Sequence, residues 1–172
     1  MCGVAGVVNL DGAAVSPAVL QRMTDAIAHR GPDGEGHWIE GNVGIGHRRL
    51  SIIDLSPAGH QPMISSDHRY LLSYNGEIYN YRELKEELRR DYKFVTTSDT
   101  EVILASYLKK GDRFVEDLKG IFSLVIWDGR VGQFILARDR NGVKPLYYYH
   151  QDGRFIFSSE IKAILEDDIP RQ

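Results

Sequence analysis

The chain has 172 residues, of which 42% are hydrophobic and 26% are charged, a composition typical of one globular domain with a single sizeable core. Lys and Arg total 21 against 24 Asp and Glu, and the formal net charge of -3 argues against a nucleic-acid-binding or polybasic membrane surface. The sequence contains neither an apolar stretch of membrane-spanning length nor a recognisable signal peptide. Because a single cysteine cannot form an internal disulfide, we expect a reducing, cytoplasmic compartment.

Strand-like runs rich in β-branched and aromatic residues recur along the chain. They are GVAGVVN (residues 3–9), GIGHRRLSII (44–53), RYLLSYN (69–75), GIFSLVIW (120–127), GQFILARD (132–139), KPLYYYH (144–150) and RFIFS (154–158). Asp128-Gly129 and Asp152-Gly153, which separate neighbouring runs, are dipeptides typical of β-hairpin turns. The sequence therefore predicts antiparallel strands joined by hairpins.

Three segments carry helix signals. They are residues 16–27 with Ser16 as N-cap, residues 80–90 with Asn80 as N-cap, and residues 98–111 with Ser98 and Glu101 as a capping box and Gly111 as C-cap. Hairpins combined with a few separate helices indicate an α+β chain. The sequence has no phosphate-binding P-loop, and none of its six histidines has metal-site spacing, so we predict no metal.

The only cysteine, Cys2, directly follows the initiator methionine. Its side chain is small enough for an aminopeptidase to remove Met1, which would leave Cys2 with a free α-amine of pKa about 7.7–8.0. Such an amine can act as the general base for the thiol of the same residue, as in N-terminal threonine nucleophiles. A lone cysteine is also commonly a small buried hydrophobe, so its position alone leaves both interpretations open.

Six motifs, in this order, carry a resemblance to a known family. They are MCGVAGVVN, HRGPDG, HRRLSIIDLSPAGHQPM, YNGEIYNYRELKEEL, TSDTEVILASYLKKG and ARDRNGVKPLYYY. Together they resemble the glutaminase domain of asparagine synthetase, a class II glutamine amidotransferase and N-terminal-nucleophile hydrolase, from Cys2 to about Leu165. The resemblance implies a four-layer αββα sandwich of two antiparallel sheets, in which Cys2 is the catalytic nucleophile.

The resemblance also implies which residues bind glutamine. Arg49 matches the residue that holds the carboxylate, a role that suits the bidentate guanidinium, whereas Arg48 is interpreted as a surface or core-edge arginine. Glu77 and Asp99 match the acceptors of the α-ammonium group. Asp99 would also be favoured in a first helical turn, and Glu77 could equally be a solvated strand residue. Residues lining the same pocket are Leu50, Ser51, Ile52 and Ile53.

Asn75 and Gly76 have two interpretations. An Asn-Gly pair between apolar runs predicts a hairpin turn. The family context instead makes the Asn75 side-chain NH2 and the Gly76 backbone N–H the donors that stabilise the oxyanion, with glycine allowing close approach of the backbone. The two interpretations are compatible, because a turn can direct both donors at the oxyanion. Among the remaining motif residues, Gly31-Pro32 is expected to end the first helix, and Asp139 and Lys144 to position loops.

The predicted reaction is hydrolysis of L-glutamine to glutamate and ammonia through a γ-glutamyl thioester on Cys2. The resemblance implies that residues 1–172 form a single glutaminase domain, and that ammonia passes to a C-terminal synthetase domain, absent here, that uses ATP and Mg²⁺ to aminate aspartate. The SPAGHQPM segment is expected to cover bound glutamine. Three alternatives remain: an acceptor other than aspartate, an N-terminal-nucleophile hydrolase of another amide, or a non-catalytic glutamine sensor. We also expect the isolated chain to self-associate weakly.

Overall fold

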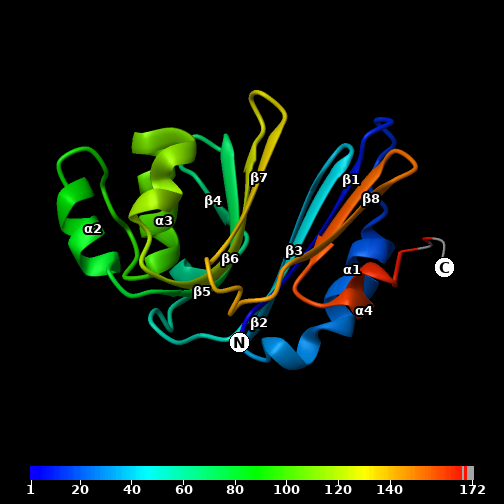
Figure 1. The fold of residues 1–172 in the computed structure, drawn as a ribbon, viewed down its shortest axis with the longest axis horizontal. Coiled ribbons are helices and arrows are strands. Elements are labelled where there is room, and N and C mark those ends of the chain that lie inside the picture. Colours follow the sequence, from blue (N-terminus) through cyan, green and yellow to red (C-terminus); the bar gives the residue numbers. More distant parts are fainter. Residues whose placement is uncertain (168, 170–172) are drawn as a thin grey trace. The chain divides into compact units, whose positions relative to one another are not determined.

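The computed structural model describes residues 1–167 and 169, which form two compact units. The first unit contains Met1–Leu50 and the chain from Pro145 onward, and the second contains Ser51–Lys144. Each unit has its own antiparallel sheet, its own helices and its own hydrophobic core (Figure 1).

The first unit is a five-stranded sheet in the order β2-β3-β1-β9-β8, with every neighbouring pair antiparallel. Its elements are β1 (Gly3–Asn9), α1 (Pro17–Ala26), a 3-10 helix (Ala28–Arg30), β2 (Gly34–Glu40), β3 (Val43–Arg49), β8 (Tyr147–Gln151), β9 (Arg154–Ser158) and α4 (Ile161–Ile164). Strand β1 is the central strand, hydrogen-bonded to β3 on one side and to β9 on the other. Cys2 directly precedes this strand.

Helix α1 packs closely on strands β1 and β3. A Cβ atom placed on Gly46 would lie 2.4 Å from Cγ2 of Thr24, so only glycine allows the helix to approach this closely. The apolar face of α1 then joins strand and C-terminal residues in the core of this unit. The core residues are Ala5, Val7, Val15, Met23, Ile27, Ile156, Ala163 and Ile164.

The second unit is a four-stranded antiparallel sheet in the order β4-β5-β6-β7. Its elements are a 3-10 helix (Pro57–Gly59), β4 (Met63–Ile64), β5 (Tyr70–Ile78), α2 (Tyr81–Leu88), α3 (Asp99–Lys110), a second 3-10 helix (Gly111–Asp117), β6 (Gly120–Asp128) and β7 (Gln133–Arg138). Helix α3 packs on β5 of this sheet, and α2 packs beside α3 (Figure 1).

Strand alternation sorts the residues of β5 and β6 between the two faces. Leu72 and Tyr74 of β5, with Leu124 of β6, pack against α3 in the core of the second unit. Asn75 and Ser123 therefore point to the opposite face, and they are directly opposite each other in the ladder of β5 and β6. Both are buried.

The predicted α+β class with two antiparallel sheets is confirmed, as are both hairpins. In the second hairpin, Asp152 and Gly153 have φ angles of 52° and 71°, as a two-residue turn of the left-handed type requires. Strands β2 and β4 are additions to the predicted set of strands. The turn expected at Asn75 and Gly76 is wrong, because β5 continues through both residues to Ile78.

The three predicted long helices are present, but their capping differs in detail. Ser16 and Asn80 stand at N-cap positions without a side-chain capping bond. The Ser98 hydroxyl accepts a hydrogen bond from Thr100 N at 3.1 Å, as predicted. Glu101 does not complete a capping box: its carboxylate accepts from the backbone N–H groups of residues 95 and 96. Gly111 ends α3 at a φ of 57°, which confirms its role.

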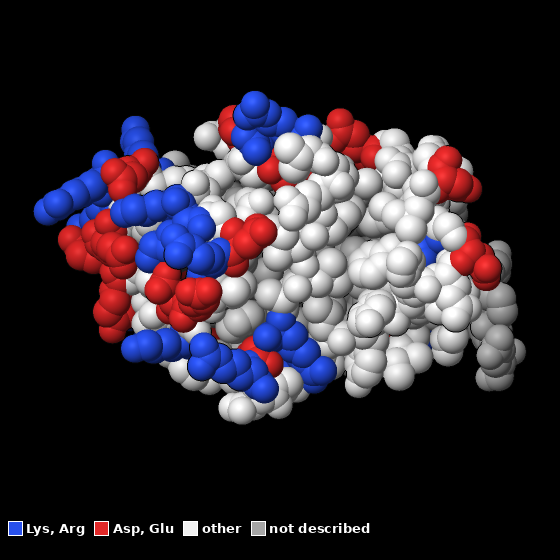
Figure 2. Space-filling model, turned by 45° about the horizontal axis from the view of Figure 1, so that its top comes forward, with Lys and Arg blue, Asp and Glu red and all other residues white. Residues whose placement is uncertain are grey.

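Charged side chains of both signs are intermingled over α2, at the left of Figure 2. Among residues 1–167 and 169, no helix is long and apolar enough to cross a membrane. The same residues contain no group of three or more His, Cys, Asp or Glu side chains arranged to hold a metal ion.

Candidate functional site

Cys2 is held at the entrance to β1 by contacts within the first unit. The Leu50 backbone N–H donates to Cys2 Sγ at 3.4 Å, and the thiol contacts Leu50 O at 3.6 Å. Arg30 Nε donates to the Cys2 carbonyl at 2.9 Å, and Arg30 Nη1 pairs with Glu160 at 2.9 Å. The thiol is half-buried, while Met1 is 52% exposed. Cys2 is therefore fixed in position, and the residue before it is accessible.

Arg49 and Leu50 follow directly from the end of β3. The Arg49 carbonyl accepts from Asp33 N at 2.9 Å, and Arg49 also pairs with Pro32 in a parallel bridge. A Cβ atom on Gly31 would lie 2.2 Å from the Arg48 carbonyl carbon, so the HRGPDG segment passes close to this strand end. The first unit thus brings together three predicted site residues, Cys2, Arg49 and Leu50.

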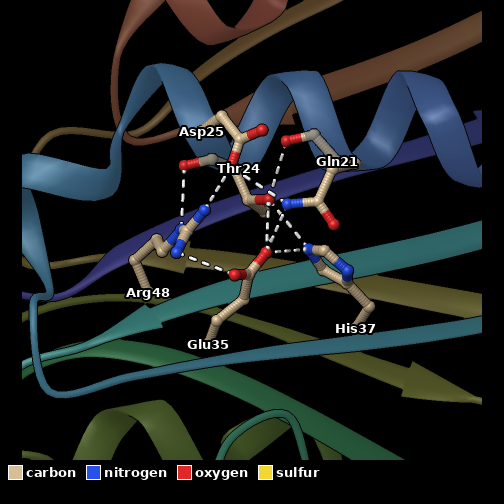
Figure 3. Close-up of polar contacts among 6 residues, drawn as sticks. All are labelled: Gln21, Thr24, Asp25, Glu35, His37 and Arg48. Carbon is tan, nitrogen blue, oxygen red and sulfur yellow. Dashed lines mark hydrogen bonds and ion pairs between the residues drawn. The ribbon is translucent and has the colours of Figure 1, made fainter.

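Arg48 anchors the same strand end from the helix side (Figure 3). Its guanidinium pairs with Asp25 and with Glu35, the latter at 2.8 Å, and its Nε donates to the Thr24 carbonyl at 3.1 Å. The Arg48 side chain is 14% exposed, which agrees with the predicted core-edge position. This network ties α1 to β2 and β3 immediately before Arg49.

His37 completes the Arg48 network. Its Nε2 lies 2.8 Å from Thr24 Oγ1 and 3.1 Å from a Glu35 oxygen (Figure 3). Burial lowers the pKa of His37 below its usual value of 6.5, although Glu35 opposes this effect. The imidazole is therefore favoured in its neutral form.

Asn75 and Gly76 lie inside strand β5 of the second unit. Asn75 is 1% exposed, and its Nδ2 is buried without a hydrogen bond to any residue in the described part of the chain. Gly76 is required by packing, because a Cβ atom there would lie 2.3 Å from Ile121 O. An unsatisfied buried donor is costly, which makes Asn75 Nδ2 the group of this strand best suited to meet a ligand acceptor.

Asp99, the first residue of α3, contacts β5 on either side of Asn75 and Gly76. Its Oδ2 accepts from the Tyr74 hydroxyl at 2.8 Å and from Ile78 N at 3.1 Å. Burial raises the pKa of Asp99, although these hydrogen bonds oppose the shift. Glu77 lies between these two contacts and is exposed. The second unit thus brings together Asn75, Gly76, Glu77 and Asp99.

Ser51, Ile52 and Ile53 begin the loop that leads to β4. The loop is anchored by Asp54, whose carboxylate accepts from both the backbone nitrogen and the hydroxyl of Thr97, at 3.0 and 3.1 Å. Further along, Gln61 is buried and accepts from Tyr74 N at 2.7 Å. The loop is therefore fastened by Asp54 to Thr97, just before α3, and by Gln61 to β5.

Comparison of the sequence with known protein families identifies the family of this chain. The profile of the glutamine amidotransferase domain matches residues 1–172. The chain belongs to the glutamine amidotransferase domain family. The resemblance drawn from the sequence motifs is thereby confirmed, and the family is one of enzymes.

Relatives of this amidotransferase domain are longer proteins. The chain is 46% identical over 176 residues to asparagine synthetase [glutamine-hydrolyzing] 2 of Bacillus subtilis, which covers 100% of the chain and 23% of that protein. It is 38% identical to asparagine synthetase B [glutamine-hydrolyzing] of Escherichia coli, over 96% of the chain and 30% of that protein. It is also 41% identical to a protein named amidase chry2 from Gibberella zeae, over 96% of the chain and 26% of that protein. The chain thus spans about a quarter of the curated relatives it matches.

The fold of the amidotransferase domain is also found among solved structures. The glutamine phosphoribosylpyrophosphate amidotransferase of Bacillus subtilis, solved with ADP and GMP, superposes with a TM-score of 0.80 at 24% identity. The match covers 95% of this chain and 43% of that chain.

Three further residues of this amidotransferase domain contact the candidate site or its loop through residues far away in the sequence. Arg30 reaches Cys2 across 28 positions, Asp54 reaches Thr97 across 43, and Ser123 lies opposite Asn75 through strand pairing. Arg30 lies in the HRGPDG motif and Asp54 in HRRLSIIDLSPAGHQPM, so these motifs could have marked both residues. Nothing in the local sequence distinguishes Ser123 from any other serine in a strand.

Proposed function

We propose that this chain is the glutaminase domain of a glutamine amidotransferase, with residues 1–172 acting as a single functional domain. The Cys2 thiolate attacks the side-chain amide carbon of L-glutamine, the amide nitrogen leaves as ammonia, and a γ-glutamyl thioester remains on Cys2. Water then cleaves the thioester to give glutamate and the free thiol. The α-amine of Cys2, exposed after removal of Met1, takes the thiol proton and later returns a proton to the leaving nitrogen.

The position of the thiol supports its role as nucleophile. A thiolate is the reactive form of cysteine, and a donor such as the Leu50 N–H, 3.4 Å from Sγ, favours that form. The hydrogen bond from Arg30 Nε to the Cys2 carbonyl fixes the backbone of the residue. Because Cys2 is the only cysteine of the chain, the thioester can form nowhere else.

The observation that carries the proposal is the unsatisfied Nδ2 of Asn75, a buried donor on β5. Attack on the amide places negative charge on its oxygen, and preorganised donors that meet this charge lower the barrier. The Asn75 NH2 group and the Gly76 backbone N–H are assigned this role. An acceptor supplied by bound glutamine explains why the protein itself leaves the Asn75 donor unpaired.

The remaining predicted residues are assigned to substrate binding. Arg49 pairs with the glutamine carboxylate through its bidentate guanidinium, and Glu77 and Asp99 accept from the α-ammonium group. Leu50, Ser51, Ile52 and Ile53 line the site, and the loop that follows them covers bound glutamine. Asp99 Oδ2 already accepts hydrogen bonds from the Tyr74 hydroxyl and Ile78 N. These bonds hold the carboxylate in place as an acceptor for the ammonium group.

In the longer protein, the ammonia is proposed to serve an ATP- and Mg²⁺-dependent synthetase domain that converts aspartate to asparagine, in a reducing cytoplasm. The names of the Bacillus subtilis and Escherichia coli relatives support this acceptor. The amidase chry2 relative, whose name mentions no asparagine synthetase, keeps an acceptor other than aspartate as the second candidate. Weak self-association of the isolated domain is part of the same proposal.

The test is glutamine hydrolysis by the purified 172-residue chain, measured as ammonia released in the absence of nucleotide. We expect steady turnover, its loss in Cys2→Ala with glutamine binding retained, and a roughly 10²–10³-fold lower kcat with little change in KM in Asn75→Ala. Binding without turnover in a wild-type chain that lacks Met1 would instead indicate a glutamine sensor. Turnover of other amides in preference to glutamine would indicate a different hydrolase.

A further inference from the structure

Ser123 is a buried polar residue to which the proposed function assigns no role. It lies in β6 with 0% exposure, and its hydroxyl oxygen makes no hydrogen bond within residues 1–167 and 169. Buried hydroxyl groups in folded proteins nearly always have a partner, so an unsatisfied one needs an explanation. A serine at this position also lacks the apolar packing that a neighbouring Val or Ile would give.

The position of Ser123 in the sheet connects it to Asn75. The two residues form a directly opposite pair in the antiparallel ladder of β5 and β6. Side chains at such positions point to the same face, with Cβ atoms about 4.5–5.5 Å apart. This face is the one opposite α2 and α3, since the alternate residues Tyr74 and Leu124 belong to the helix-side core. The two unsatisfied groups, Asn75 Nδ2 and Ser123 Oγ, are therefore neighbours.

The other cross-strand neighbour of Ser123 does not satisfy it. Arg138 of β7 is opposite Ser123 on its second side. The Arg138 guanidinium is directed to backbone carbonyls instead: its Nε donates to Lys144 O at 2.7 Å and its Nη2 to Gly142 O. Asn75 is thus the partner that strand pairing leaves for Ser123.

We propose that Ser123 is a positioning residue for the side-chain amide of Asn75. In the substrate-bound state, Asn75 Nδ2 donates one hydrogen to Ser123 Oγ and the other to the glutamine amide oxygen. An amide nitrogen carries two hydrogens, so both donations are compatible. This hydrogen bond satisfies both buried atoms and fixes the direction of the second hydrogen. The inference rests on the proposed role of Asn75 in glutamine hydrolysis.

The expected consequence is a loss of preorganisation when the hydroxyl is removed. Ser123→Ala leaves Asn75 in place but free to rotate, so the oxyanion loses a directed donor and the ground-state substrate loses little. We expect kcat for glutamine hydrolysis to fall about 3- to 10-fold, the equivalent of one hydrogen bond, with KM changed less than about twofold. Because the hydroxyl is unsatisfied in the free protein, its removal should not lower the melting temperature.

The experiment is a double-mutant cycle on the 172-residue chain, with Ser123→Ala, Asn75→Ala and the double variant compared with wild type. We expect Ser123→Ala to have no further effect on kcat in the Asn75→Ala background, because Ser123 acts through Asn75. Ser106→Ala is the matched control: Ser106 is equally buried in the same unit, but its hydroxyl donates to Val102 O at 2.8 Å within α3. That control should lower stability slightly and leave kcat unchanged.

Three outcomes separate this inference from the proposed function. An unchanged kcat in Ser123→Ala, or an equal loss in the presence and absence of Asn75, overturns the assignment of Ser123 while the glutaminase function stands. A fall in melting temperature that accounts for the lost activity also overturns it. A wild-type chain without Cys2-dependent glutamine hydrolysis overturns the proposed function and the role of Ser123 with it.

Discussion

The Asp54 carboxylate accepts two hydrogen bonds from Thr97, one from its backbone nitrogen at 3.0 Å and one from its hydroxyl at 3.1 Å. The other carboxylate oxygen accepts from the backbone nitrogen and the hydroxyl of Ser56, at 2.9 and 2.6 Å. The loop that begins with Ser51 is thereby fastened to the residue directly before the N-cap of α3. These hydrogen bonds hold the pKa of Asp54 well below its usual value of 3.8, and the bond from the Ser56 hydroxyl has the largest effect.

Replacing Asp54 with Asn should make the loop easier to open at neutral pH. The charged acceptor is lost, so we expect unfolding to become easier by about 1–3 kcal/mol and KM for glutamine to rise more than kcat falls. A group whose pKa is lowered on folding stabilises above its unfolded pKa and loses that effect as the pH falls. The difference between wild type and Asp54→Asn in urea unfolding should therefore shrink below about pH 3.8. A difference that is constant from pH 7 to pH 3 contradicts this account.

Gly76 should tolerate no side chain. A Cβ atom there would lie 2.3 Å from Ile121 O and 2.7 Å from Phe122 Cα, and backbone atoms cannot move aside as a flexible side chain can. We expect Gly76→Ala to lower the free energy of unfolding by about 1–3 kcal/mol and to reduce turnover strongly. Gly34→Ala is the control, since its new Cβ meets no atom closer than 3.7 Å. Equal stability of the two variants would show that β5 and β6 are less closely paired than described.

Features set by adjacent residues were predictable from the sequence. The Asp152-Gly153 turn depends on two residues that tolerate positive φ, and the end of α3 depends on Gly111. The same rule failed at Asn75-Gly76, where pairing of β5 with the whole length of β6 overrides the local turn preference. Strand β2 was not predicted, because its GEGHWIE sequence lacks a run of β-branched residues and is stabilised by pairing with β3.

The candidate site was predictable only as far as its motifs are contiguous. Cys2, Arg49, Asn75, Gly76, Glu77 and Asp99 each stand in a recognisable segment. The contacts that fix them join residues far apart in the sequence, such as Asp99 with Tyr74, and no local pattern contains that information. For the same reason, the unsatisfied state of Asn75 and the pairing of Ser123 with it emerge only from the folded sheet.

His37 should make the first unit sensitive to mild acid. Its pKa is lowered on folding, so its contribution to stability is present above its unfolded pKa of 6.5 and is lost as the pH falls below that value. We expect wild type to lose stability between about pH 7 and pH 5, and His37→Gln to lose less over the same range. Urea unfolding at several pH values measures this, with the exposed His60→Gln as control. Identical pH profiles of wild type and His37→Gln would contradict the assignment.

Arg49→Lys should weaken glutamine binding more than it slows the chemical step. A lysine supplies a point charge in place of a bidentate guanidinium, so we expect KM to rise about 10- to 100-fold with a smaller change in kcat. Arg48→Lys is a matched control one residue away. Arg48 is committed to Asp25, Glu35 and the Thr24 carbonyl, so its replacement should lower stability and leave KM nearly unchanged. If Arg48→Lys raises KM as much as Arg49→Lys, the carboxylate partner is misassigned.

The proposed function depends on Cys2, which attacks glutamine with its own α-amine as base. Its most direct test is mass spectrometry of the 172-residue chain after inactivation with an electrophilic glutamine analogue. We expect a chain that lacks Met1, one covalent adduct located on Cys2, and loss of glutaminase activity in proportion to that adduct. Full activity in a chain that retains Met1, or complete inactivation with the adduct on another residue, would contradict it.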